Sequence, residues 1–252
     1  MITAYHRPQT LDEALTLLTQ PNRTPLGGGT LLSRSSTASI EAVDLQGVGL
    51  NVVKKRGNNL EVGATVTLQQ LLESEDCPQS LKSALKLEAP LNIRNAATVA
   101  GTLIACDGRS TFVSVLLALD TKLELRKLED SKVETRTANI GEFLPLRDLQ
   151  GWLITSITIP LNVKLAFDYV SRTPADRPIV CVALVQWNSG RTRLALGGYE
   201  GSPLLAMDGT EADGAGAAAR NAFHEAADEY GSAEYRMDVA ATLANRCLES
   251  IK

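Results

Sequence analysis

Hydrophobic and polar positions along the first 50 residues predict a small α/β unit. A short strand at residues 5–7 is followed by a helix that Thr10 and Glu13 open as a capping box, with leucines at helical spacing up to residue 18. A second strand leads into the sequence PLGGGT, a helical turn is expected at residues 31–33, and a further strand at 42–45. The three glycines therefore lie where a strand gives way to a helical turn.

Residues 51–160 show a different pattern, in which hairpins alternate with helices. Two strands flank a turn at 57–59, and helices follow from Thr67 and over residues 77–87. An apolar helix is expected at 112–119, strands at 122–128 and 133–137, and a short helix at 140–145. A strand at 152–159 ends at Pro160, and Leu161 with Asn162 is the most favourable domain junction.

The remaining residues predict a separate domain of strands followed by helices. Strand-like runs at 164–171, 179–188 and 191–196 favour a three-stranded antiparallel sheet, and helices are expected at 214–230 and 233–251. The fold class expected is α+β. Two α/β subdomains (about 1–50 and 51–160) precede a C-terminal domain (161–252) that holds the three-stranded sheet and helices.

Composition narrows the range of functions. The 252 residues are 44% hydrophobic and 21% charged, the balance of a globular protein, and the net charge of −4 with dispersed Lys and Arg argues against nucleic-acid binding. No apolar run is long enough to span a bilayer and the start lacks the pattern of a signal peptide, so a cytoplasmic protein is expected. Four widely spaced cysteines and two histidines predict no metal site, and any redox chemistry must come from a cofactor.

Two glycine-containing stretches are the candidate binding elements. Residues 25–30, PLGGGT, have either of two interpretations: a flexible turn, or a backbone cradle whose N–H groups bind phosphate oxygens without a positive side chain. In the second stretch, residues 97–103, Gly101 lies between Ala100 and Thr102, so backbone could again approach a ligand closely.

Taken together, these stretches make the chain resemble the flavin-binding subunits of molybdenum hydroxylases, the family of the carbon monoxide dehydrogenase medium subunit and the xanthine dehydrogenase flavin domain. The resemblance covers nearly the whole chain. It rests on the following segments: the GGGT loop at 27–30, VGA at 62–64 with Thr67 and Leu68, IRN at 93–95 with Ala97 and Thr98, LLALD at 116–120, residues 193–198, and Tyr235 with Arg236.

The resemblance implies that residues 1–160 bind FAD between the two subdomains. The first loop and the second stretch would supply N–H groups to the diphosphate, and Ile154 would pass near the flavin ring. The implied cofactor-binding residues are Leu26, Gly27, Gly28, Gly29, Thr30, Leu31, Thr98, Val99, Gly101, Thr102, Asp107, Thr111 and Ile154. No residue of this chain is expected to be catalytic or to bind a metal.

The implied function is that of the FAD subunit of a molybdopterin-dependent dehydrogenase. A molybdenum-cofactor subunit would oxidise the substrate, an iron–sulfur subunit would carry the electrons, and FAD would pass them to an acceptor such as NAD or a quinone. The alternative is a chain that keeps the fold without FAD and serves as a binding or assembly module for those partner subunits.

The second stretch departs from the family pattern, which has Gly-Gly-Asn followed by an Ala-Ser-Pro segment and an aspartate that binds FAD. Here Ala100 and Thr102 replace a glycine and the asparagine, and Thr111 stands where the aspartate is expected. Asp107 is a candidate replacement acceptor and Arg109 a candidate cation near phosphate. Glu88 and Arg94 flank this stretch and either face the ligand or form a solvated surface pair, and the surface pair is the favoured interpretation.

Overall fold

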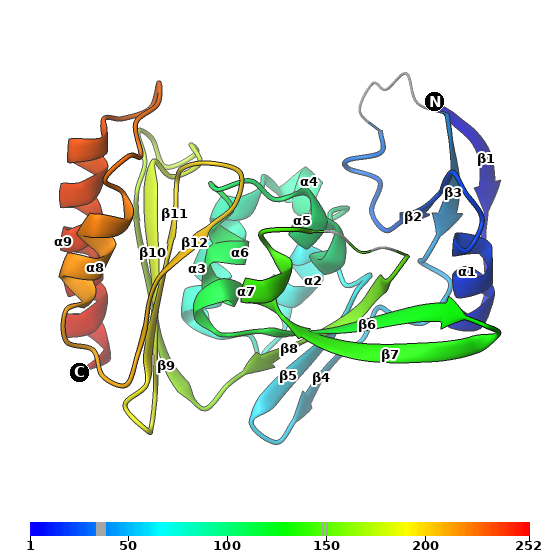
Figure 1. Ribbon diagram of the computed structural model, residues 1–252, viewed down its shortest axis with the longest axis horizontal. Helices are drawn as coiled ribbons and strands as arrows, with labels where there is room; N and C mark the ends of the chain where they lie inside the picture. Colours follow the sequence, from blue (N-terminus) through cyan, green and yellow to red (C-terminus); the bar gives the residue numbers. More distant parts are fainter. Residues whose placement is uncertain (34–38, 148, 150) are drawn as a thin grey trace. The chain divides into compact units, whose positions relative to one another are not determined.

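The computed structural model describes residues 1–33, 39–147, 149 and 151–252, which form two compact units. The first unit comprises Met1–Glu75, Leu91–Ala105 and Lys122–Thr158, and the second unit comprises Asp76–Pro90, Cys106–Thr121 and Ile159–Lys252. Figure 1 shows the elements of both. Each unit therefore draws on segments that lie far apart in the sequence.

A three-stranded parallel sheet opens the first unit. Strands β1 (Ile2–His6) and β2 (Arg23–Leu26) both pair in parallel with β3 (Ile40–Asp44), so β3 is central. Helix α1 (Leu11–Leu18) begins at Thr10, whose hydroxyl accepts from the Glu13 N–H. Ala14 and Leu15 of this helix pack with Val43 and Leu45. The predicted strand, helix and strand are confirmed.

A five-stranded sheet forms the rest of the first unit, in the order β4-β5-β8-β6-β7. Its strands are β4 (Val53–Arg56), β5 (Asn59–Gly63), β6 (Lys122–Glu129), β7 (Lys132–Asn139) and β8 (Leu153–Pro160). Buried and accessible residues alternate along β5 and β6, as expected when one sheet face is covered. Besides α1, the described segments of this unit contain the helices α2 (Leu68–Glu73), α4 (Leu91–Arg94), α5 (Val99–Ala105) and α7 (Ile140–Phe143).

The second unit is a sheet between two pairs of helices. Its antiparallel sheet has the order β12-β11-β10-β9, built from β9 (Val163–Val170), β10 (Val180–Trp187), β11 (Thr192–Gly197) and β12 (Leu204–Gly209). Helices α8 (Ala215–Ala222) and α9 (Ala233–Ile251) cover one face, and α3 (Gln79–Glu88) and α6 (Thr111–Ala118) cover the other (Figure 1). Because both faces are covered, six successive residues of β10 are fully buried.

The α+β fold class is confirmed, and three details differ from the expectation. The sheet of the second unit has a fourth strand, β12, so the three-stranded sheet was wrong among the described residues. Helix α8 ends at Ala222, where the chain turns so that Phe223 becomes fully buried. Segments 76–90 and 106–121 belong to the second unit, because α3 and α6 pack on its sheet.

The interpretation of Glu88 as a surface residue was also wrong. One carboxylate oxygen of Glu88 accepts from the Ser110 hydroxyl at 2.9 Å, the Phe112 N–H at 2.9 Å and the Thr111 hydroxyl at 3.2 Å. These three partners are fully buried. Glu88 thus binds the first turn of α6, while Arg94 donates to Gln69 at 2.9 Å.

Glu88 should make stability fall as pH rises. Burial raises the pKa of its carboxyl above the ordinary 4.5, and the hydrogen bonds offset this only in part. A raised folded-state pKa stabilises the fold below the unfolded-state pKa, and this contribution is lost as pH rises through the folded value. We expect Glu88→Gln to gain stability relative to the parent protein as pH rises above about 4.5, measured by urea unfolding across pH. A difference independent of pH would contradict this.

Candidate functional site

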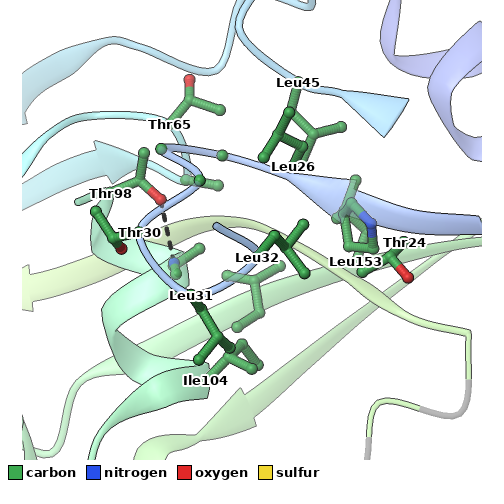
Figure 2. A pocket seen from close by; sticks show the side chains of 18 of the residues that line it. Thr24, Leu26, Thr30, Leu31, Leu32, Leu45, Thr65, Thr98, Ile104 and Leu153 are labelled. Carbon is green, nitrogen blue, oxygen red and sulfur yellow. Dashed lines mark hydrogen bonds between the residues drawn. The ribbon is translucent and has the colours of Figure 1, made fainter. Parts of the chain in front are cut away.

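The glycine loop that follows β2 forms one wall of a cavity in the first unit. The cavity has a volume of about 280 Å³ and lies among β2, the loop, α5 and β8 (Figure 2). It is lined by Thr24, Pro25, Leu26, Gly27, Gly28, Gly29, Thr30, Leu31, Leu32, Leu45, Ala64, Thr65, Thr98, Ala100, Gly101, Ile104, Leu149, Leu153 and Ile154. The tertiary structure thus brings the two predicted stretches together around one space.

Each glycine of the loop is required for its own geometric reason. A Cβ on Gly28 would lie 1.6 Å from the carbonyl oxygen of Ala96, and one on Gly27 would lie 2.6 Å from the Thr98 hydroxyl. Gly29 has φ of 72°, in the left-handed region that glycine adopts without strain. The loop can therefore pack directly on the second stretch only because two of its residues lack side chains.

The backbone N–H groups of the loop remain available to a ligand. From Gly27 to Leu32, none donates to a described residue. The turn is closed by a hydrogen bond in which the Gly29 carbonyl oxygen accepts from the Ser33 N–H at 2.9 Å, so this bond uses none of the N–H groups from Gly27 to Leu32. A run of unpartnered N–H groups beside a cavity is an arrangement that binds oxyanions such as phosphate.

The second stretch differs, since its N–H groups are already used. It is the start of α5 and not a loop: the Val99 N–H donates to Val66 at 2.8 Å and the Ala100 N–H to Ala64 at 3.2 Å. The Gly101 N–H donates to the Thr98 hydroxyl at 3.2 Å, the bond drawn in Figure 2, and the Thr102 N–H to the Thr98 carbonyl at 2.8 Å. This stretch shapes the cavity, but its four N–H groups already bond to the protein and are not free to bind a ligand.

Four of the predicted site residues do not line the cavity. Val99 is fully buried, and the Thr102 hydroxyl donates to the Thr98 carbonyl at 2.9 Å. Asp107 and Thr111 belong to the second unit. The buried Thr111 hydroxyl donates to the Ala84 carbonyl at 2.7 Å, so it forms part of the α3–α6 packing.

Asp107 and Arg109, the candidates to compensate near phosphate, are engaged within the second unit. Partial burial alone would raise the pKa of Asp107, but the ion pair with Arg177 outweighs it and lowers this pKa. The Arg109 guanidinium donates to the carbonyls of Arg177 and Pro178, and its Cζ lies 4.2 Å from the centre of the Tyr230 ring. Both side chains tie loops of the second unit together.

The cavity also has apolar lining that sequence reasoning missed. Leu32, Leu45, Ile104, Leu149 and Leu153 extend it beyond the loop (Figure 2). Ile104 follows Ala100 and Gly101 by one helical turn, so a helical interpretation of residues 99–105 would have placed it on the same face. Such lining excludes water and strengthens hydrogen bonds from nearby N–H groups.

The residues present fit a diphosphate-containing cofactor and give no sign of a metal. Gly27 and Gly28 allow a close packing of the loop that a Cβ would prevent, and the loop N–H groups beside the cavity lack partners among the described residues. Across the described residues, no group of three or more His, Cys, Asp or Glu is placed to hold a metal ion. Nor does any helix in that part of the chain have the length and apolar character to cross a membrane.

Comparison with known families agrees with this geometry. Residues 1–162 match the model of the FAD binding domain in molybdopterin dehydrogenase, which is well over half of the chain. The chain belongs to this family. As a member of the FAD-binding domain family it contains the cradle and the cavity within the matched region, and FAD is the cofactor of the family.

Relatives of this FAD-binding chain match it over nearly its full length. The uncharacterized protein YgfM of Escherichia coli K12 is 27% identical, over 96% of this chain and 94% of its own. The carbon monoxide dehydrogenase medium chain of Afipia carboxidovorans is also 27% identical, over 98% and 96%. A solved structure of reconstituted CO dehydrogenase from Oligotropha carboxidovorans superimposes with a TM-score of 0.81 at 26% identity, covering 98% of this chain and 96% of that one.

Proposed function

We propose that this chain is the flavin subunit of a multi-subunit molybdenum hydroxylase and passes electrons through FAD to an acceptor. The observation that carries the proposal is the run of unpartnered N–H groups from Gly27 to Leu32 over a cavity inside the matched family region. Bound FAD would supply the electron chemistry, because none of the described side chains that line the cavity is redox-active.

The proposed cofactor-contacting residues are those that both line the cavity and were expected from the sequence. They are Leu26, Gly27, Gly28, Gly29, Thr30, Leu31, Thr98, Gly101 and Ile154. The loop would hold the diphosphate through backbone N–H groups, and the leucines and isoleucines would keep water away from it. Val99, Thr102, Asp107 and Thr111 are left out, since their polar groups serve the protein's own packing.

The proposed partners are a molybdenum-cofactor subunit and an iron–sulfur subunit, with NAD or a quinone as the acceptor. Support comes from the relatives, which include medium chains of a carbon monoxide dehydrogenase and a glyceraldehyde dehydrogenase. A cytoplasmic location is part of the proposal, because the four cysteines are free and buried, as is usual in a reducing compartment.

One spectrum and one titration test the proposal. The purified chain is expected to be yellow, or to take up added FAD with quenching of the flavin fluorescence. A colourless protein that ignores FAD across the titration would overturn it. If that flavin-free chain still copurified with stoichiometric partner subunits, the alternative role as an assembly module would be favoured.

A further inference from the structure

We propose that Gln46 is a positioning residue for the cofactor cradle: its side-chain amide holds the Gly27 carbonyl and thereby aims the N–H groups of the loop at the ligand. Gln46 does not line the cavity, and its Nε2 lies 3.4 Å from the Gly27 oxygen. The inference rests on the proposed function, because the ligand it concerns is FAD.

The segment that carries Gln46 is anchored at the end of β3. Asp44 is only 4% exposed, and its carboxylate accepts from the Gln46 N–H at 3.0 Å and from the Tyr5 hydroxyl. A buried carboxylate that binds a neighbouring backbone N–H fixes the local chain direction. Gln46 therefore starts from a rigid point of the parallel sheet, although its own side chain is exposed.

This anchored segment donates hydrogen bonds to two consecutive carbonyls at the start of the loop. The Leu45 N–H donates to the Leu26 oxygen at 2.9 Å, and the Gln46 amide donates to the next oxygen, that of Gly27. In a trans peptide the C=O and the N–H of one unit point in opposite directions, and the described residues contain no cis peptide. The N–H groups of Gly27 and Gly28 therefore both point away from residues 45 and 46.

The cavity reaches both sides of the loop. Leu45 lines it on one side, and Leu31 with Ile104 line it on the other side, away from residue 46 (Figure 2). Gly27 and Gly28 line the cavity, whereas Gln46 does not. Two successive N–H groups that point to the same side form a concave site for an anion.

The peptide between Gly27 and Gly28 needs such a restraint. It is one of two peptides in the loop with glycine on both sides, and glycine populates positive and negative φ about equally, so this peptide plane can rotate at low cost. Rotation would point the Gly27 oxygen at the ligand's phosphate and remove the Gly28 donor. The Gln46 bond opposes that rotation, which is why we assign it a role in binding and not only in folding.

The test compares Gln46→Met, which keeps the length but has no donor, with Gln46→Lys, which keeps a donor. FAD affinity is measured by fluorescence titration at two salt concentrations, so that the lysine charge can be separated from its hydrogen bond. We expect the Met variant to bind FAD about 2- to 12-fold more weakly and the Lys variant to bind as the parent does at high salt. Because residue 46 is exposed, the unfolding temperature should not change in either variant.

A second readout follows the cradle directly. In the FAD complex, hydrogen exchange at the Gly28 amide should be slow in the parent and the Lys variant and faster in the Met variant. If the parent protein binds no FAD, the proposed function fails and this inference fails with it. If the parent binds FAD and the Met variant matches it in affinity and in Gly28 exchange, only the positioning role is overturned.

Discussion

Gly28→Ala is expected to reduce FAD affinity by roughly 5- to 150-fold and to destabilise the first unit. The added Cβ would lie 1.6 Å from the Ala96 oxygen and 2.5 Å from the Ala96 carbonyl carbon, both backbone atoms that cannot rotate away. Overpacking of this kind costs about 1–3 kcal/mol, and the loop must leave its position to relieve it. Fluorescence titration with FAD and thermal unfolding of the same preparation measure the two effects.

Two further glycine variants calibrate this result. Gly101→Ala should have a smaller effect, because its Cβ would meet only the Thr98 hydroxyl, at 2.9 Å, and a side chain can adjust. Gly201→Ala is the matched control, since nothing lies within 4 Å of its Cβ position. Parent-like FAD affinity and unfolding temperature in Gly28→Ala would show that the loop does not pack on Ala96 as described.

Arg193→Met is expected to destabilise the second unit by about 2–4 kcal/mol. The Arg193 side chain is 6% exposed, and its guanidinium binds Asp208 at 2.8 Å, Asp120 at 3.1 Å and the Leu117 carbonyl at 3.0 Å. Methionine fills much of the same space but leaves the buried Leu117 carbonyl without this donor. Urea unfolding measures the loss.

Arg191→Met provides the matched control in the same charge cluster. Arg191 binds the same two carboxylates, Asp120 at 2.9 Å and Asp208 at 2.8 Å, but its side chain is 40% exposed. Exposed ion pairs contribute only about 0–1 kcal/mol, so this variant should stay close to the parent. Equal losses in the two variants would mean that burial does not set the value of these contacts.

Short-range patterns accounted for most helices and strands. The helix expected from Thr67 begins there, with a capping box in which Thr67 and Gln70 exchange hydrogen bonds, and the hairpin after residue 56 turns at Gly57. These features depend on residues only three or four positions apart, so they can be recognised in the sequence itself. Strand β12 was not predicted, because its sequence LLAMDG lacks the alternation of apolar and polar residues that marks a strand. Its strand conformation is stabilised by antiparallel pairing with β11, which the sequence pattern does not reveal.

The sequence alone was sufficient to find the two stretches that build the cavity and, through resemblance, the family and its cofactor. It could not decide between a turn and a cradle at Gly27–Gly29, because a glycine's role depends on which atoms lie against its Cα. At Gly28 the neighbouring atom is the carbonyl oxygen of Ala96, which lies 68 residues further along the chain. Only the tertiary structure shows that the N–H groups of the first loop bond to none of the described residues while α5 uses its own, since hydrogen-bond partners such as Val66 and Ala64 are brought there by the fold.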